Sequence, residues 1–391
     1  MTPAAAPAAN ASSRPPAAAA IALAAAVAAL AFTFLHAESQ AAVGWIAASS
    51  VAAVLAAARL GALRWASRGA LARERTTSVA LAAGLAALVL AFHDDHFTLL
   101  LLARVLLVAT ACLGLHVQFG MAGVVNFAGA AFFGIGSYTA AVLAGRTSVP
   151  HVAVLAAAGA LAALVGSVLL LPLLRTRGHY AALITIAFGI GFRTFLEVND
   201  ALGGPQGLNV AGFSLLGFSF NENWTVRGVE VSFYVAYVAL AFLLLGGAFA
   251  VVRRLETSWI GLALDAVRLD ETAAASFGVR VPRWKIGAFT LGNFVTGVAG
   301  ALSAMMTGYI APNAFTFQES LVFVSIVLLG GIGNAWGLLL ATFLVVVVPE
   351  KLQAIQEYRF LLFASLVVLV LVFRPSGLVP RALRRRFGEA P

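Results

Sequence analysis

Apolar runs of about 20 residues, separated by short polar segments, recur along nearly the whole chain. This is the length of an α-helix that crosses a bilayer, whereas the strands of a membrane barrel are shorter and alternate in polarity. The runs predict spans at about 17–35, 41–60, 77–92, 97–117, 127–145, 151–174, 179–198, 231–252, 285–308 and 358–373. The pattern predicts an all-α fold, a polytopic membrane helix bundle of about ten to twelve spans. A signal peptide is the alternative for 17–35, but a second apolar run follows it at once.

Two glycine-rich breaks interrupt this pattern. The region 318–349 is too long for one span and contains the sequence Gly-Gly-Ile-Gly-Asn at 330–334, which favours two short helices around a turn in or near the membrane. A similar break with Asn126 follows Gly120 in the first half of the chain. Paired broken helices are typical of a central transport path. The alternative is that the glycines only allow close helix packing.

The segment 257–285 is a polar and charged island between the apolar runs. Apolar residues recur on one face and charged residues on the other: Ile260, Leu262, Leu264, Val267 and Leu269 against Asp265, Arg268, Asp270 and Glu271. Gly278 favours a helix end and Pro282 blocks its continuation. The segment predicts a short amphipathic helix, or a helix pair, at the membrane surface, where a partner docks. A helix that lies on lipid is the alternative, but such helices favour Lys and Arg rather than acidic residues.

Composition and charge fix the class of protein. The chain has 391 residues, of which 61% are hydrophobic and 10% charged, so it is an integral membrane protein. Its net charge of +9 comes from loops, where basic residues set membrane topology, and does not indicate nucleic-acid binding. The positive-inside rule places the basic segments 64–75, 175–177, 253–285 and 381–386 on the cytoplasmic side, and with them both termini. The single Cys112 excludes a disulfide framework.

The missing motifs are equally informative. The sequence contains no phosphate-binding loop of the Walker type and no His/Cys cluster at metal spacing, so neither a nucleotide site nor a metal site is predicted in this chain. Coupled carriers usually bury acidic residues in their spans, but the charged candidates here are few: Arg104, and Arg193 with Glu197 as a neutralising i,i+4 pair. No cluster of polar catalytic groups is present, so an enzyme is not predicted. We therefore expect energy for transport to enter from outside the chain, through 257–285.

Four blocks of sequence resemble the branched-chain amino acid permease family of ABC importers, in order and in spacing. The blocks are Gly120 to Tyr138, Tyr180 to Arg193, Gly203 to Leu208, and the segment from Gly261 to Gly337 that begins with a coupling loop ending at Gly278. They cover about residues 100–350. The sequence departs from the family pattern at Asn126, Ala128-Gly129 and Ile190, which bears on the substrate more than on the fold.

Composition predicts an Ala/Pro-rich disordered tail at 1–16, an extension of membrane spans at 17–95 that matches nothing in the family, and a basic cytoplasmic tail at 376–391. The resemblance places the permease domain at 96–375, with its coupling loop at 257–285, and implies a set of partners. The implied partners are a second homologous permease, two cytoplasmic ABC ATPases that bind ATP and magnesium, and a solute-binding protein. No cofactor is implied for this chain. The implied substrate is a branched-chain, hydrophobic amino acid that crosses the bacterial inner membrane. Urea, short amides or sugars are alternatives within the ABC class, and a secondary carrier is the alternative outside it.

The resemblance also implies three groups of site residues. Those that couple the chain to the ATPases are Gly261, Leu264, Asp265, Arg268, Asp270, Glu271 and Gly278, with Leu264, Val267 and Leu269 seated in a groove of the partner. Those along the substrate path are Gly120, Gly123, Asn126, Gly330, Gly331 and Asn334, whose backbone groups would meet the solute. Those that dock the binding protein are Gly203, Gly204, Pro205 and Gly207, for which an ordinary turn is the alternative.

Overall fold

The computed structural model describes residues 17–37, 74–174, 179–215, 218–226, 229–331 and 333–351, with isolated residues at 39, 45–46, 49, 361, 365 and 368. The chain divides into two compact units. Residues 1–93 with 351–354 form the smaller unit, and residues 94–350 with 355–391 form the larger one. The larger unit contains the polar island and both glycine-rich breaks.

Several predicted features lie outside the described residues. They are the tail 1–16, most of the apolar run 41–60, most of the basic loop 64–75, the basic segment 175–177, the last span at 358–373 and the tail 376–391.

Within its described residues, the smaller unit has two helices that pack together, α1 (Ala17–His36) and α4 (Glu74–Ala91). The rings of Phe32 and Phe92 lie 5.5 Å apart between their centroids. Lys351 donates a hydrogen bond of 2.7 Å to the carbonyl of Leu35. An aromatic contact thus joins α1 to the residue after α4, and Lys351 bonds the last turn of α1.

The larger unit contains the remaining helices, joined by short turns. Its long helices are α5 (His96–Leu115), α6 (Gly129–Arg146), α7 (His151–Leu173), α8 (His179–Val198), α9 (Tyr234–Thr257), α12 (Val281–Thr307), α13 (Phe317–Gly330) and α14 (Ala335–Lys351). Its short helices are the π-helix η1 (His116–Met121), the 3-10 turns η2 (Asp200–Leu202), η3 (Gly204–Gln206) and η4 (Pro312–Ala314), and the pair α10 (Trp259–Leu269) and α11 (Glu271–Ser276).

These helices follow the predicted spans within a few residues. In the part of the chain that the structure describes, six helices are long and apolar enough to cross a membrane: His96–Met121, His151–Leu173, Tyr180–Val198, Tyr234–Thr257, Val281–Thr307 and Pro312–Gly330. The chain is therefore a membrane helix bundle, and the total of ten to twelve spans stays a prediction. The region 318–349 forms two short helices, α13 and α14, with a turn at the predicted glycines.

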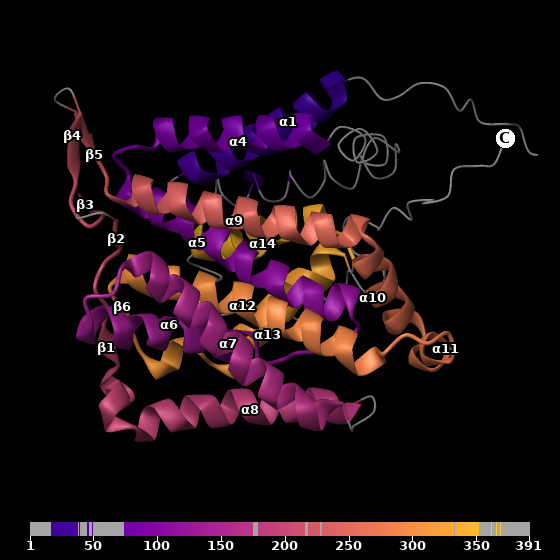
Figure 1. The fold of residues 1–391 in the computed structure, drawn as a ribbon. Helices are drawn as coiled ribbons and strands as arrows, with labels where there is room; N and C mark the ends of the chain where they lie inside the picture. The colour runs from indigo at the N-terminus through magenta and orange to yellow at the C-terminus, as the bar shows by residue number, and fades with distance from the viewer. Residues whose placement is uncertain are drawn as a thin grey trace, which may run out of the picture. The chain divides into compact units, whose positions relative to one another are not determined.

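The core of the larger unit lies around α5 and α12. Helix α12 packs against α5, α6 and α7 (Figure 1), and α5 is the most buried of the six candidate spans. Close approach is possible because glycines line the contacts: a Cβ on Gly136 would overlap the carbonyl of Gly297, and one on Gly300 would overlap that of Phe133. Glycine lets helix backbones approach one another in this way in membrane bundles.

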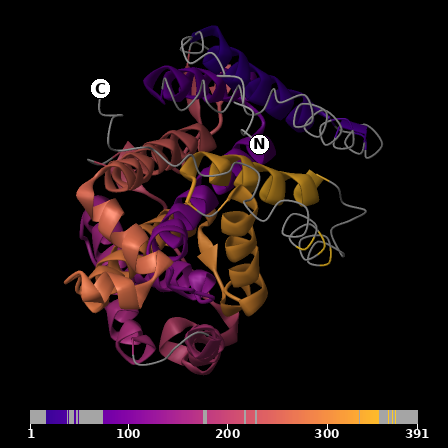
Figure 2. The ribbon, with the colours of Figure 1, turned by 90° about the vertical axis from the view of Figure 1, so that its right-hand side faces the viewer.

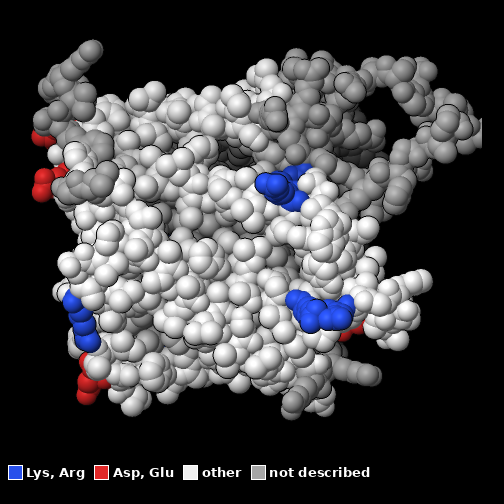
Figure 3. Space-filling view, in the orientation of Figure 1, with Lys and Arg blue, Asp and Glu red and all other residues white. Residues whose placement is uncertain are grey.

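The two ends of this unit differ. Figure 1 shows α10 and α11 at one end and the short strands at the other, and Figure 2 views the molecule from the end with α10 and α11. The strands pair antiparallel, β1 (Leu208–Asn209) with β6 (Tyr309–Ile310), β2 (Ser214–Leu215) with β3 (Phe218–Ser219), and β4 (Trp224–Val226) with β5 (Val229–Val231). These two- and three-residue strands are the only departure from the all-α prediction among the described residues. Charged side chains are sparse on the face drawn in Figure 3.

Candidate functional site

The polar island folds as the predicted helix pair. Ser258 separates α9 from α10, and Asp270 separates α10 from α11. The Asp270 carboxylate caps α11, because it accepts hydrogen bonds from the backbone N–H groups of Thr272 at 2.8 Å and Ala273 at 3.0 Å. Gly278 ends the pair with φ +80°, a left-handed conformation that favours glycine. Lys285 forms an ion pair of 2.6 Å with Glu271 and so ties α11 to the start of α12.

The two faces of this helix pair have different neighbours. Gly261, Leu264 and Val267 are buried inside the chain. A Cβ on Gly261 would overlap the carbonyl oxygen of Leu255, so α10 turns tightly back on the last turn of α9. Leu264 and Val267 are thus occupied by the chain's own core in this conformation. Helix periodicity predicted an apolar face here, but not that the chain itself covers it.

The exposed face of the pair is also partly apolar. Leu262 is 52% exposed, Leu269 77% and Phe277 87%. Asp270 and Glu271, next to Leu269, are exposed, whereas Asp265 and Arg268 are partly buried, with a distance of 4.0 Å between their charged groups. Large apolar side chains exposed together with charged groups are typical of a protein contact surface. We call Leu262, Leu269 and Phe277 the coupling surface.

Helix α10 packs against the first glycine-rich break. The long helix of α5 ends in the π-helix η1, and the chain then runs without regular structure to α6. Gly123 stands in this irregular stretch with φ +69°, and a Cβ there would lie 3.1 Å from Cγ of Arg268. π-Turns are rare and occur frequently at functional sites. The polar island and the first glycine-rich break are separate features in the sequence but are in direct contact in the structure.

The two breaks also meet each other. A Cβ on Gly120 would lie 3.3 Å from the backbone nitrogen of Gly333. Gly331 and Gly333 have φ values of +107° and +90°, so the turn between α13 and α14 depends on glycine. Gly330 is buried where α13 crosses α14, because a Cβ there would lie 2.6 Å from Cα of Leu338. The predicted path residues thus come together at the end of the bundle that carries α10.

The asparagine of each break has the same local role. Oδ1 of Asn126 accepts a hydrogen bond of 2.8 Å from Ala128 N, and Oδ1 of Asn334 accepts one of 3.0 Å from Trp336 N. Both asparagines are buried, and each accepts a hydrogen bond from the backbone N–H two residues further on. Trp336 lies in the first turn of α14, whereas Ala128 stands directly before α6, so the weak symmetry in the sequence corresponds to a repeated Asx turn.

A buried amide cluster crosses the bundle next to the first break. Nε2 of Gln118 donates to Oδ1 of Asn293 at 2.8 Å, and Nδ2 of Asn126 donates to Oε1 of Gln118 at 2.7 Å. Nδ2 of Asn293 is buried without a hydrogen-bond partner among the described residues. Of these three residues, only Asn126 was predicted from the sequence. Gln118 and Asn293 could have been found as lone amides in apolar spans, because such side chains usually form hydrogen bonds with another helix.

Replacing Gln118 with leucine is expected to lower the free energy of unfolding by about 1–3 kcal/mol, because buried amides of Asn126 and Asn293 lose their partners. Thermal unfolding of the purified chain in mild detergent measures this loss. Gln206 to leucine, on an exposed turn, is the control. An unchanged melting temperature for the Gln118 variant would contradict the role of the cluster.

A second buried polar group lies at the same end of the bundle. Nε2 of His116, at the start of η1, lies 3.3 Å from Oε1 of Glu256, and Glu256 also pairs with Arg253. The His116 and Glu256 side chains are 0% and 7% exposed. Glu256 stands directly before the α9–α10 turn, so this group links η1 to the base of α10. The sequence alone does not predict this group, because His116 and Glu256 are 140 positions apart.

The loop at the opposite end is a tight, bonded turn. Gly203 and Gly207 have φ values of +82° and +73°, and a Cβ on Gly207 would overlap the carbonyl oxygen of Ile310. The β1–β6 pairing holds the loop against the segment before α13, and the hydroxyl of Tyr309 donates a hydrogen bond to the Gln206 carbonyl at 2.5 Å. Pro205 and Gln206 are exposed at its tip, whereas Gly204 is buried. The glycines therefore have a structural reason, and the exposed tip leaves a surface for a partner.

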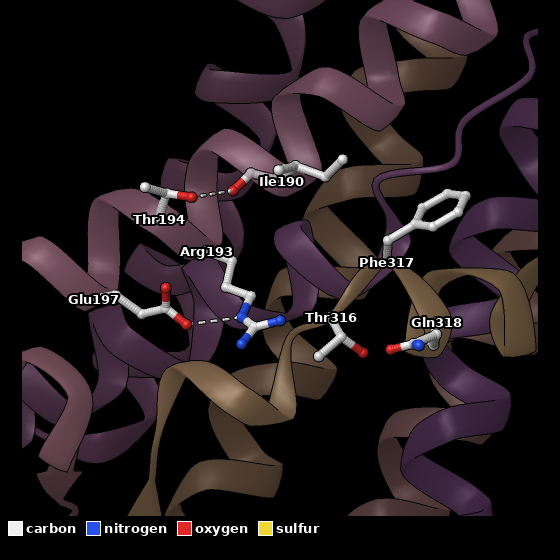
Figure 4. A pocket seen from close by; sticks show the side chains of 7 residues that line it. All are labelled: Ile190, Arg193, Thr194, Glu197, Thr316, Phe317 and Gln318. Carbon is white, nitrogen blue, oxygen red and sulfur yellow. Dashed lines mark hydrogen bonds and ion pairs between the residues drawn. The ribbon is translucent and has the colours of Figure 1, made fainter.

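A pocket of about 460 Å³ lies beside this loop, between the end of α8 and the start of α13 (Figure 4). Ile190, Arg193, Thr194, Glu197, Thr316, Phe317 and Gln318 line it. Nε of Arg193 donates to Glu197 at 2.8 Å, as the i,i+4 spacing predicted. Arg104 also pairs with an acid, at 3.7 Å from Glu350. Among the described residues, no group of three His, Cys, Asp or Glu residues could hold a metal ion.

The family model that matches this chain and the relatives similar to it belong to one family. Residues 97–373 match the family described as branched-chain amino acid transport system / permease component. The high-affinity branched-chain amino acid transport system permease protein LivM of Salmonella typhimurium is 34% identical over 295 residues, which cover 71% of this chain and 69% of that protein. LivM of Escherichia coli K12 is 34% identical over 282 residues, covering 68% of this chain and 66% of that protein. The permease protein BraD of Pseudomonas aeruginosa is 27% identical over 287 residues, covering 70% and 91%. No solved structure gives a significant match.

Proposed function

Because the chain belongs to the branched-chain amino acid transport system permease family, we propose that it is the membrane permease subunit of an ATP-driven importer for branched-chain, hydrophobic amino acids. The relatives named above carry this transport activity in their names. The match spans about two thirds of the length of the two LivM proteins. The observation that carries the proposal is the α10–α11 pair, which packs against the first helix break and also exposes the coupling surface.

The proposed assembly follows from what the chain lacks. A nucleotide site is missing from the sequence, so two ABC ATPases in the cytoplasm would bind ATP and magnesium. A second, homologous permease would complete the path, as the paired names LivM and LivH among the relatives suggest. A solute-binding protein would dock on the loop that contains Gly203, Gly204, Pro205 and Gly207. The subunit would reside in a bacterial inner membrane, with both termini in the cytoplasm.

The proposed coupling step moves the helix breaks. An ATPase that grips the coupling surface would push α10, whose other face contacts Gly123 through Arg268 and the end of α9 through Gly261. The His116–Glu256 contact would pass the same movement to η1. Helix breaks are suited to this role, because they can reorient with few changes in the packed core. Asp265, Asp270 and Glu271 would orient the pair through charge, with Gly278 fixing its exit.

The coupling surface tests this function directly. Replacing both Leu269 and Phe277 with serine is expected to abolish co-purification of the ABC ATPases, because these side chains are largely exposed in the chain alone and contribute apolar contact only to a partner. Affinity purification of the tagged chain in mild detergent, with mass spectrometry of the bound proteins, measures the effect. The melting temperature of the chain itself should not change.

Leu243 to serine is the matched control, since Leu243 is 69% exposed in the middle of α9, away from the pair. This variant should retain the ATPases. Recovery of the wild-type chain as a clean monomer or homodimer across several detergents would reject the importer and favour a carrier that works alone.

A further inference from the structure

The pocket beside the loop 203–207, which we call the outer loop, has the size and the composition of a small-molecule site. Its volume of about 460 Å³ is within the range for ligand pockets. Figure 4 shows Arg193 and Glu197 on α8 and Thr316 near them at the start of α13, with Ile190 and Phe317 together at one side of the pocket. The pocket therefore combines two opposite charges and a hydroxyl group with an apolar wall.

The ion pair in this pocket is not explained by stability. Helix α8 is long and apolar enough to cross a membrane, and charged side chains in such helices usually face a protein interior or a water-filled cavity. Arg193 is 42% exposed and Glu197 37% exposed, so both reach the cavity rather than the core. An exposed i,i+4 ion pair contributes little to folding. A charged pair that faces a cavity and contributes little to folding can meet a ligand there.

The sign pattern of the pocket restricts that ligand. A simple anion would be attracted by Arg193 but repelled by Glu197. A simple cation would be attracted by Glu197 but repelled by Arg193. A molecule with a carboxylate and an ammonium group close together can replace each half of the ion pair with a bond to itself. Its side chain would then lie against Ile190 and Phe317. This is the chemistry of an α-amino acid with an apolar side chain.

The position of the pocket fits an entry site. Gly204 of the outer loop lies against the last turn of α8, since a Cβ on it would be 3.6 Å from the carbonyl oxygen of Glu197. The C-terminal end of α8, which lines the pocket, lies at the opposite end of the larger unit from α10 and α11 (Figure 1). A solute released at the outer loop would reach this pocket before the helix breaks.

We propose that the pocket between α8 and α13 binds the zwitterionic head of an imported amino acid, with Arg193 holding the carboxylate and Glu197 the ammonium group. This inference rests on the proposed function, because it identifies where that substrate first binds in the membrane subunit. The predicted neutralising pair is then a pair that opens to admit substrate.

Cysteine protection measures binding at this site without relying on transport. Cys112 is the single native cysteine and is fully buried, so Thr194→Cys introduces one accessible thiol on the pocket wall. The complete importer carrying this change is reconstituted in liposomes and reacted with a charged methanethiosulfonate. Leucine is expected to slow the reaction at least about fivefold by occupying the site. The analogues 4-methylpentanoate, which lacks the ammonium group, and 3-methylbutylamine, which lacks the carboxylate, are expected to give no protection.

Second variants separate direct binding from indirect effects. Adding Arg193→Gln or Glu197→Gln to the Thr194→Cys chain should remove the protection, whereas Glu230→Gln, an exposed carboxylate in strand β5 outside the pocket, should leave it intact. The double exchange Arg193→Glu with Glu197→Arg restores an ion pair on the helix but reverses its direction. Protection lost in this exchange supports the site, and full protection in it assigns the pair a structural role only.

The experiment distinguishes a wrong pocket from a wrong function. If the wild-type complex imports leucine but leucine does not protect the introduced thiol, the pocket is not the site. If the wild-type complex imports no amino acid at all, the proposed function fails and the pocket loses its ligand with it.

Discussion

Uptake should fall to background when Gly261 is replaced by valine, although the chain should still insert into the membrane. A Cβ at this position overlaps the carbonyl oxygen of Leu255 and would lie 3.1 Å from Cα of Glu256, both in the last turn of α9. These neighbours include backbone atoms, which cannot rotate away. Helix α10 must therefore move outward, at a cost of about 1–3 kcal/mol, and lose its contact with Gly123.

Two measurements and a control make the result specific. Transport of labelled leucine should be lost, whereas the amount of subunit in the membrane should match the wild type. Gly287 to alanine is the control, because Gly287 is exposed on the adjoining helix α12 and nothing lies within 4 Å of its missing Cβ. Normal uptake by a well-inserted Gly261 variant would remove α10 from the coupling mechanism.

Gly136 to leucine is expected to prevent folding rather than coupling. The helix α6 approaches α12 so closely here that a Cβ would overlap the carbonyl group and Cα of Gly297. A leucine would force apart the pair of helices with the largest contact in the bundle, at a cost of about 3 kcal/mol or more. The measurement is the fraction of tagged protein that elutes as a single peak in size-exclusion chromatography from mild detergent.

The same helix provides the matched control for this change. Gly145 lies at the exposed end of α6, and nothing is within 4 Å of its missing Cβ. Gly145 to leucine should behave like the wild type in the same chromatography. A monodisperse Gly136 variant with an unchanged melting temperature would show that α6 and α12 can separate at little cost.

Hydropathy alone predicted most of the helices, because a single apolar segment that crosses a bilayer is stable only as a helix. The structure confirms the helix boundaries at 151–173 and the turn between α13 and α14 within a few residues. The π-helix at 116–121 could not be predicted, because the sequence gives no sign of an extra residue in a helical turn.

The candidate site was predictable in its parts but not in its connections. The helix pair at 259–276 followed from periodicity and from Asp270 and Gly278. Leu264 and Leu269 are five positions apart and so lie about 140° apart around the helix. Only the fold shows which of these two faces the chain covers: Leu264 is buried and Leu269 is exposed. Likewise Gln118 and Asn293 are 175 positions apart, and only the folded bundle brings them together.

The glycine contacts of α12 have a consequence for genetics. At an ordinary core contact, a variant with an enlarged side chain can be rescued by a second change that trims its neighbour. Gly136 faces Gly297, and Gly300 faces the backbone of Phe133, so at these two points nothing remains to be trimmed. A suppressor screen on such variants should return reversions of the original codon. We therefore expect the helices around α12 to be the part of this permease that tolerates the fewest amino-acid changes.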